Sequence, residues 1–408
     1  MQNLLGWWPR ALTAALVVSV GLLATGRVEF FGSGGSVSAW SISRTTFFFW
    51  LLWKLAQFYQ SGLERLELNR LKSLASLHLF FAVVTVSLLP DFHQAGDYRY
   101  FFFGCVHAVM IVDVFSATPQ RRSLPLLLGI LPVILVLRGL LYNPAILHFS
   151  LDQRFAYPLD HANTAGYLLA MSLPLGITIA LTRTGWWRSF SLVSCASQML
   201  ALVLTFSRGA WLGWFVSMVY LAATLKRLKI LAGLVLVPAA CILAFPALQT
   251  RLASLTRPHD DPAIQERLQR LTSSLQLGLD HPILGVGYGR GRLKEYLPAY
   301  LKGTILEGAP ILHTHNVYAE LFAETGAIGL LSFLWLLGQT LWRVWRSALA
   351  CEGAHRLLGW GLTASWVAAA VTGIGDVPFY HHETRIYFFT LFAVAHMYYS
   401  NRSDNPAL

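Results

Sequence analysis

The chain has 408 residues, of which 55% are hydrophobic, 13% are aromatic and 12% are charged, and its mean hydropathy is +0.52. Soluble domains carry about 25% charged residues, so this composition excludes an ordinary soluble domain and predicts a chain with many membrane spans. The formal net charge of +11 would suit a nucleic-acid partner, unless membrane topology accounts for the basic residues.

Apolar stretches that approach the ~20 residues of a transmembrane helix recur along the chain. The first follows residues 1–10, and we interpret it as an uncleaved span rather than a signal peptide. Twelve spans are predicted, near residues 11–26, 45–60, 71–90, 99–117, 123–142, 161–182, 186–206, 209–226, 228–248, 315–342, 356–375 and 384–400. The predicted fold class is therefore an all-α integral membrane protein with about 12 transmembrane helices and one long loop. Its regions are spans 1–9 (residues 1–248), the loop (249–314), and spans 10–12 with a short tail (315–408).

The distribution of Lys and Arg residues predicts the orientation of these spans. With a cytoplasmic N-terminus, fifteen of them fall in inside segments and six in short outside segments. This excess favours an even number of spans and explains most of the basic charge as topology, so we expect no nucleic-acid partner. The long loop falls on the outer face, and its eight Lys and Arg residues indicate an anionic partner there.

Two arginines near the outer ends of predicted spans are candidates for anion binding. Arg208 lies in the turn between two spans, within the sequence VLTFSRGAWLGWF. An arginine in this position either snorkels to the interface or grips an anion, because a guanidinium can bind two phosphate oxygens at once. Arg138, near the outer end of its span, is a weaker candidate for the same role.

The long loop is predicted to contain an amphipathic helix that begins at Pro262, with Asp260 or Asp261 as its cap. Its apolar stripe consists of Ile264, Leu268, Leu271 and Leu275. Such a stripe is typical of a helix that lies on a membrane or on other helices. Arg267 and Arg270 flank it, either as anion ligands or as solvated residues, and for Arg270 the pattern favours the solvated role.

Two other motifs of the loop resemble ligand sites but favour structural roles. The segment GVGYGRG, residues 285–291, has neither the preceding strand nor the following G-K-[ST] of a phosphate-binding P-loop, so it predicts a turn. Asp260 and Asp261 could hold a metal ion as a carboxylate pair, but the proline that follows them favours a turn and a helix cap. Few outer carboxylates and many outer arginines indicate a site that binds phosphate without a metal.

His313 and His315 precede a predicted helix that begins near Asn316. The N-terminus of a helix disfavours an imidazolium ion, so His315 suits a general base, which must be neutral to accept a proton. One alternative is that both are interfacial histidines without a chemical role. The other is a metal site, which His381 and His382 would have to complete because zinc needs three or four protein ligands.

Several of these motifs together resemble the O-antigen ligase and polymerase superfamily. The segments are SRGAWLG, ERLQRL, HPILGVGYG and HNVYAELFAETGAIG. Ligases of this superfamily have an arginine followed four residues later by leucine, here Arg267 and Leu271. They also have a His-Asn pair followed after nine residues by Gly-x-x-Gly, here His315-Asn316 with Gly326 and Gly329. Polar residues of the family also match Asn163 after His161, and Asp376 with Pro378.

This resemblance implies a GT-C-like architecture in the bacterial inner membrane, with an active site that faces the periplasm. The implied reaction is an inverting, metal-independent glycosyl transfer without a cofactor, from a glycan on undecaprenyl diphosphate to a sugar hydroxyl of lipid A–core, among membrane lipid. Arg208 and Arg267 would then bind the diphosphate, and His315 would accept the proton of the hydroxyl. The implied supporting residues are Arg138, Arg270, His313, Asn316, Tyr318 and Asp376.

Three alternatives to a ligase stay open. Polymerases and protein O-oligosaccharyltransferases of the same superfamily share these motifs, although a single long outer loop and the short stretch after the last span favour the ligase. A membrane transporter is the alternative from another class. It needs ionisable residues within the membrane, and apart from Lys54, Asp113 and Arg138 the charges are predicted to lie at the edges of spans.

Overall fold

The computed structural model describes residues 2–404 with gaps at 26–27, 30–35, 38, 62–73, 89–96, 117, 119–122, 131, 149, 151, 160, 227–242, 244, 257–260, 311–312 and 378–380. The described part is almost entirely helical, with one short antiparallel pair of strands, β1 (Val28–Glu29) and β2 (Ser36–Val37). The helices are α1 (Gln2–Thr25), α2 (Ala39–Ser61), α4 (Ala75–Val86), α5 (Tyr98–Phe115), α6 (Leu124–Ile130), α7 (Pro132–Tyr142), the 3-10 helix η4 (Pro144–His148), α8 (Ala162–Thr182), α9 (Gly185–Leu204), α10 (Arg208–Leu225), α12 (Pro246–Thr256), α13 (Pro262–Asp280), α14 (Arg290–Tyr296), the 3-10 helix η5 (Leu297–Leu301), α15 (Val317–Leu349), α16 (Gly353–Gly375) and α17 (His382–Asp404).

The predicted class of a helical membrane protein is confirmed. Within the described residues, six helical segments are long and apolar enough to cross a membrane, namely Tyr98–Phe115, Leu124–Tyr142, Ala162–Thr182, Gly185–Leu204, Val317–Leu349 and Gly353–Gly375. Described helices cover most of eleven of the twelve predicted spans. The ninth, 228–248, lies largely outside the described residues, so the count of twelve stays a prediction.

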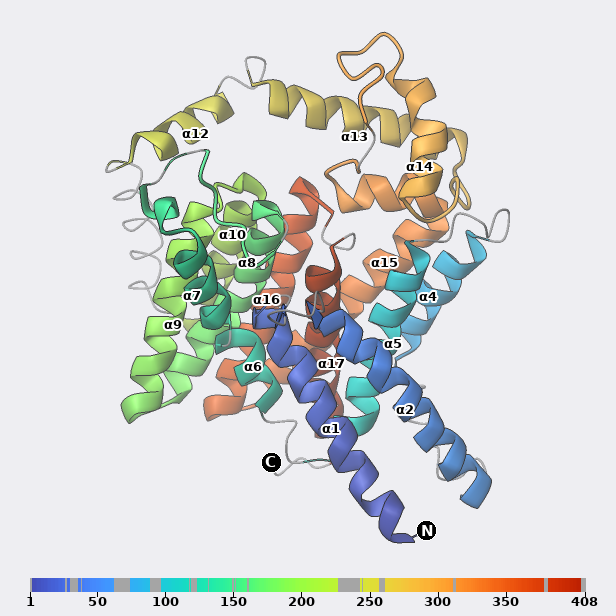
Figure 1. Cartoon of the computed structure of the whole chain (residues 1–408), viewed down its shortest axis with the longest axis vertical. Coiled ribbons are helices and arrows are strands. Elements are labelled where there is room, and N and C mark those ends of the chain that lie inside the picture. The colour runs from blue at the N-terminus through green and yellow to red at the C-terminus, as the bar shows by residue number, and fades with distance from the viewer. Residues whose placement is uncertain are drawn as a thin grey trace.

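The helices form a bundle whose centre is occupied by α8 and α16. The helix α8 packs on α9, α10 and α16, and α16 also packs on α10 and α15. Nearly every side chain of α8 is buried, as expected for a helix surrounded by protein on all sides. In Figure 1, α12, α13 and α14 cross the end of the bundle that lies opposite the N-terminus, and we call these three helices the cover.

The helix α13 begins as predicted, but two leucines of its apolar stripe are exposed. Asp261 is the N-cap, its Oδ1 accepts a hydrogen bond from the amide of Ala263 at 2.9 Å, and a proline fills the first turn. The buried face consists of Arg270, Ser273, Ser274, Leu277 and Gly278. Leu268 and Leu275 of the predicted stripe are 56% and 41% exposed. These two leucines therefore do not pack on other helices, which was one of the two predicted positions for the stripe. The other, on the membrane surface, stays open.

The helix α15 is interrupted at Gly326, where φ is 64° and ψ is −168°, and the segment 282–287 fills the interruption. The amides of Val286 and Gly287 donate to the carbonyls of Ala323 and Glu324 at 2.9 and 2.8 Å. In return, the amide of Ala327 donates to the carbonyl of Pro282 at 2.7 Å. Backbone groups that a helix break leaves without partners are thus satisfied by the loop. The predicted turn at GVGYGRG is confirmed, and its backbone serves α15 rather than a phosphate.

Two of the ionisable residues that a transporter would need bind each other. The ammonium of Lys54 on α2 lies 2.7 Å from Oδ2 of Asp113 on α5, and the indole of Trp50 donates to the same carboxylate at 2.8 Å. A buried charge is costly unless it is paired and hydrogen-bonded. This pairing therefore gives both residues a structural role between two helices of the bundle.

Candidate functional site

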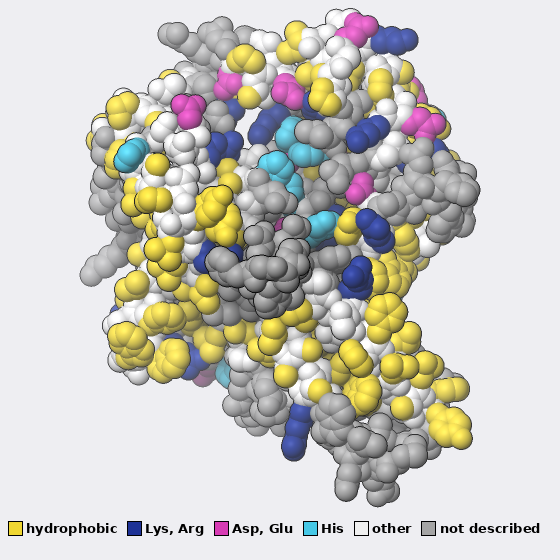
Figure 2. Space-filling view, in the orientation of Figure 1, with side chains coloured by type: hydrophobic (Ala, Val, Ile, Leu, Met, Phe, Trp, Pro, Cys, Tyr) yellow, Lys and Arg dark blue, Asp and Glu magenta, His cyan; other side chains and the backbone are white. Residues whose placement is uncertain are grey.

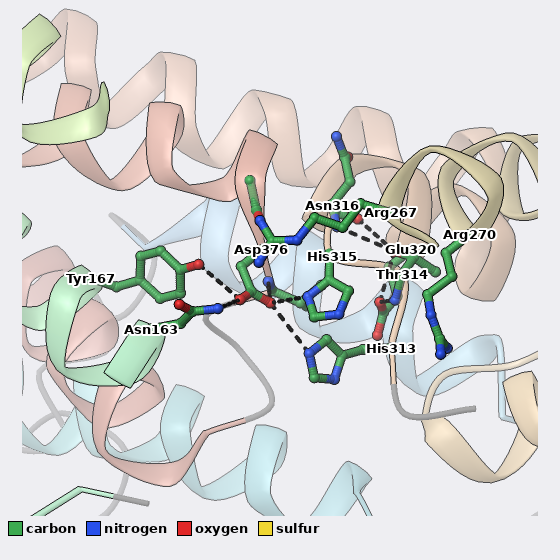
Figure 3. Close-up of polar contacts among 12 residues, drawn as sticks. Asn163, Tyr167, Arg267, Arg270, His313, Thr314, His315, Asn316, Glu320 and Asp376 are labelled. Atoms are coloured by element: carbon green, nitrogen blue, oxygen red, sulfur yellow. Dashed lines mark hydrogen bonds and ion pairs between the residues drawn. The ribbon is translucent and has the colours of Figure 1, made fainter. Parts of the chain in front are cut away.

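A hollow opens on one face of the molecule beneath the cover. Figure 2 shows histidine side chains inside this hollow and Lys or Arg side chains around it. Residues from α8, α13, α15 and α16 meet there, as Figure 3 shows, with the carboxylate of Asp376 at the centre of their polar contacts. The sequence-based candidates Arg267, His313, His315, Asn316 and Asp376 therefore lie together.

Asp376 follows the last residue of α16, and its side chain is only 3% exposed. Its Oδ1 lies 3.2 Å from Nδ1 of His315 and 3.3 Å from Nε2 of His313. Its Oδ2 accepts hydrogen bonds from the amide group of Asn163 and the hydroxyl of Tyr167, both at 2.8 Å. Both oxygens are thus held by donors from several elements.

These partners favour the ionised form of the carboxylate. Burial alone would raise the pKa of Asp376, but the hydrogen bonds from His313 and His315 outweigh it and hold the pKa well below its usual value. An ionised carboxylate can only accept hydrogen bonds. It follows that His315 donates through Nδ1 and His313 through Nε2, which leaves Nε2 of His315 as the proton-accepting nitrogen of that ring.

His315 is held in an unusual backbone conformation by its two neighbours. Its φ is 57°, a left-handed value that non-glycine residues adopt only where the surroundings enforce it. On one side, the amide and the hydroxyl of Thr314 donate to Oε2 of Glu320 at 2.6 and 2.9 Å. On the other side, Asn316 caps α15 by accepting from the amides of Tyr318 and Ala319. The prediction that His315 lies just before the helix is confirmed.

The polar side-chain atoms of Asn316 and Tyr318 form hydrogen bonds within the protein. Beside its capping role, the side-chain amide of Asn316 donates to the carbonyl of Ile374 at 3.1 Å. The hydroxyl of Tyr318 donates to the carbonyl of Ala370 at 2.6 Å. Both contacts fasten the start of α15 to the end of α16, so they fix His315 relative to Asp376. Their predicted contact with substrate is not tested by these distances.

Arg208 reaches the same region because two glycines let α10 approach α16. A Cβ atom on Gly375 would lie 3.0 Å from the Cα of Gly209, so the two backbones are almost in contact. Arg208 is the first residue of α10, and its Nη1 lies 2.9 Å from Oδ2 of Asp261. This ion pair joins the start of α10 to the cap of α13. Asp261 therefore acts as a cap and an arginine partner, whereas Asp260 lies outside the described residues.

The two arginines of α13 are in different environments. Nη1 of Arg267 donates to the carbonyl of Gly375 at 3.2 Å, one residue before the central carboxylate. Arg270 is 4% exposed, and its guanidinium binds Glu266 at 2.8 Å and the carbonyl of Pro310 at 3.2 Å. Arg270 is thus buried and paired, so the favoured expectation of a solvated side chain is wrong. Arg267 is the arginine of this helix that reaches the site.

Arg138 has contacts of its own. Its Nη2 donates to the hydroxyl of Tyr157 at 3.1 Å, and its guanidinium lies 5.5 Å from the centroid of that ring. None of the contacts described for Asp376 and the two histidines involves Arg138, so its assignment to substrate stays a prediction. Pro378, which the sequence pattern grouped with Asp376, lies outside the described residues.

Two members of the site carry little or no sequence signal. Tyr167 is one aromatic residue within a long apolar span, and nothing in its neighbourhood marks it as a partner of Asp376. Arg154 donates to Oδ1 of Asn163 at 2.9 Å and to the carbonyl of Thr205 at 2.8 Å, which orients the amide that binds the carboxylate. Its place among the outer arginines was the only available signal.

The central cluster also has the composition of a metal site. His313, His315 and Asp376 each offer one ligand atom, and these atoms lie within 4.8 Å of one another. Two imidazoles and one carboxylate suit zinc in number and type. The cluster can therefore hold a proton-accepting histidine or a metal ion, and the two uses need different tautomers of the His315 ring.

We expect Asp376→Asn to destabilise the protein at neutral pH by about 1–3 kcal/mol, because an amide group would face donors that now bind a carboxylate oxygen. Since the pKa of Asp376 is depressed in the folded protein, its ionisation stabilises the fold above its unfolded pKa of about 3.9. That stabilisation is lost as the pH falls through the folded pKa. Thermal unfolding in detergent between pH 3 and pH 7 measures this difference, which should shrink toward the acid end. A constant difference across that range would contradict the ionised state.

One comparison with known protein families covers part of this site. Residues 190–334 match the model of a family described as O-antigen ligase. A search of curated proteins finds no match to the chain. A chain of the solved assembly described as "Structural coordination of polymerization and crosslinking by a peptidoglycan synthase complex" is similar over 82% of this chain and 98% of its own length, with 17% identity and a TM-score of 0.48. The matched family region includes Arg208, Arg267, His313 and His315.

Proposed function

We propose that this chain, whose residues 190–334 match the O-antigen ligase family model, transfers a glycan from undecaprenyl diphosphate to a sugar hydroxyl of lipid A–core. The transfer takes place at the periplasmic face of the bacterial inner membrane, in the hollow beneath the cover. The observation that carries this proposal is the contact between Nδ1 of His315 and Asp376 at 3.2 Å, with Arg267 bound to the residue before Asp376.

His315 is the general base of the proposed reaction. Asp376 takes the hydrogen bond of Nδ1, so the ring is oriented with Nε2 as its proton acceptor. Asn163 and Tyr167 hold Asp376 from the other side, and Asn316 fixes the backbone next to His315. In this arrangement Asp376 positions the base and does not itself contact the sugar.

Arg208 and Arg267 are the proposed diphosphate ligands. A guanidinium is always charged and matches phosphate oxygens in pairs. As the glycan leaves its carrier, negative charge develops on the diphosphate, and fixed cations that face this charge lower the barrier. The ion pair of Arg208 with Asp261 and the bond from Arg267 to Gly375 keep both cations close to Asp376 by way of α13.

The chemical step is a single displacement. The acceptor hydroxyl attacks C1 of the first donor sugar from the side opposite the diphosphate, and its proton passes to Nε2 of His315. The bond between C1 and the phosphate oxygen breaks with its electron pair staying on undecaprenyl diphosphate. The configuration at C1 is inverted, and His315 later gives its proton to water.

The purified protein in proteoliposomes tests this function. The assay supplies undecaprenyl-diphosphate glycan and lipid A–core, with a chelator present, and resolves the products as a lipopolysaccharide ladder. We expect lipid A–core to shift to glycan-bearing bands, and His148→Asn, at an exposed histidine of η4, to do the same. Unchanged lipid A–core with lengthened lipid-linked glycan would assign a polymerase instead, and glycan on a Ser- or Thr-containing peptide would assign a protein O-oligosaccharyltransferase.

A further inference from the structure

The cluster around Asp376 brings together more imidazoles than a general base needs. The ring of His315 lies 4.4 Å from that of His313, which lies 6.2 Å from that of His381. We propose that His313, His315, Asp376 and His381 bind a divalent transition-metal ion of the zinc type, and that the bound ion inhibits the enzyme. The binding itself does not depend on the proposed transfer reaction, whereas the inhibition rests on it.

The distances are close to those of a zinc site. Three ligand atoms already lie within 4.8 Å of one another. Zinc binds imidazole nitrogens at about 2.0–2.1 Å in a tetrahedral arrangement, which puts the centroids of two such rings about 5 Å apart. The observed centroid distances of 4.4 and 6.2 Å bracket that value. The group within 4.8 Å does not include His381, so the side chain of His381 would have to rotate toward the other three residues to complete the site.

The ligand types favour zinc over the common hard cations. Magnesium and calcium prefer oxygen ligands, whereas imidazole suits zinc, copper and nickel. The carboxylate is also supported as a metal ligand should be, because Asn163 and Tyr167 bind its second oxygen and leave Oδ1 toward the histidines.

Metal binding and base catalysis exclude each other at His315. As a base, the ring carries its proton on Nδ1 and accepts a second one on Nε2. A metal ion beside Asp376 takes the lone pair of Nδ1, so the ring proton must move to Nε2 and that nitrogen can no longer accept the acceptor proton. No proton is released or consumed in this exchange, since each ring only changes its tautomer.

Equilibrium dialysis of the full-length protein in detergent against zinc chloride, after treatment with a chelator, tests the binding. We expect saturable binding of about one ion per chain. The variants His313→Asn and His381→Asn should each weaken it by tenfold or more, on the order of the loss that such ligand changes cause. His148→Asn removes an exposed histidine of η4 outside the cluster and should leave the affinity unchanged. Absent saturable binding, or equal affinity in all three variants, would overturn the proposal.

The effect on activity is measured in the same preparation. We expect zinc chloride to suppress transfer and a chelator to restore it. His381→Asn should keep the basal rate, because His381 has no part in the proposed transfer, and should need about tenfold more zinc for half-inhibition. An unchanged zinc response in this variant would reject the inhibitory role. If the wild-type protein transfers no glycan at all, the proposed function fails, but the dialysis result still decides whether the metal site exists.

Discussion

Replacing His315 with alanine is expected to lower the rate of glycan transfer by about 10²–10⁴-fold, the usual contribution of a general base. The contact with Asp376, which takes Nδ1 at 3.2 Å, orients the ring of His315 with Nε2 as its proton acceptor. The two arginines that are proposed to bind the diphosphate stay in place, so donor binding should change little. Single-turnover transfer in proteoliposomes, together with donor binding, separates these two effects.

His313→Ala is the matched control for this result. His313 contacts the same carboxylate oxygen at 3.3 Å, and its removal perturbs Asp376 without removing the proposed base. We expect a smaller loss of rate than for His315→Ala. An equal loss in both variants would mean that the histidines act as one unit, as metal ligands do, and a wild-type rate in His315→Ala would end its assignment as the base.

The local parts of the site could be predicted from the sequence. Asn316 caps α15 through its own side chain, and Asp261 followed by proline caps α13, because capping depends on residues two or three positions apart. The family spacing that connects His315 with Gly326 also has a local cause. Gly326 has a positive φ at the interruption of α15, and His315 lies just before the start of the same helix. The number of residues between them is therefore set within one helix.

The contacts that bring distant parts of the chain together in the site could not be predicted from local patterns. Asp376 lies 61 residues from His315 and 209 residues from Tyr167, and no periodicity connects positions so far apart. The approach of Gly209 to Gly375 follows from helix packing, which short motifs do not encode. Arg270 shows a related limit: its pairing with Glu266 follows from the i, i+4 spacing, but its burial depends on which face of α13 meets the bundle.

Replacing Gly326 with alanine is expected to have the second large effect, a destabilisation on the order of 4 kcal/mol. Gly326 has a φ of 64° and a ψ of −168°, a backbone region that is essentially restricted to glycine and costs an alanine about 1–3 kcal/mol. The added Cβ would also overlap the carbonyl group of Ile283, which belongs to the segment that fills the α15 interruption. To make room this segment must move, and the amides of Val286 and Gly287 then lose their partners.

The same change should reduce transfer more than it reduces the amount of folded protein. The segment 282–287 follows α13 directly, and α13 carries Arg267, while α15 begins next to His315. Separating the segment from α15 would therefore separate Arg267, the proposed diphosphate ligand, from His315, the proposed base. Gly338→Ala is the control, because it lies in the same helix and its Cβ would meet no atom within 4 Å. Thermal unfolding and transfer should be unchanged in Gly338→Ala and both reduced in Gly326→Ala. Equal melting temperatures for the two variants would show that the interruption of α15 at residue 326 does not depend on glycine. The glycine at this spacing from His315 would then have to be explained in another way.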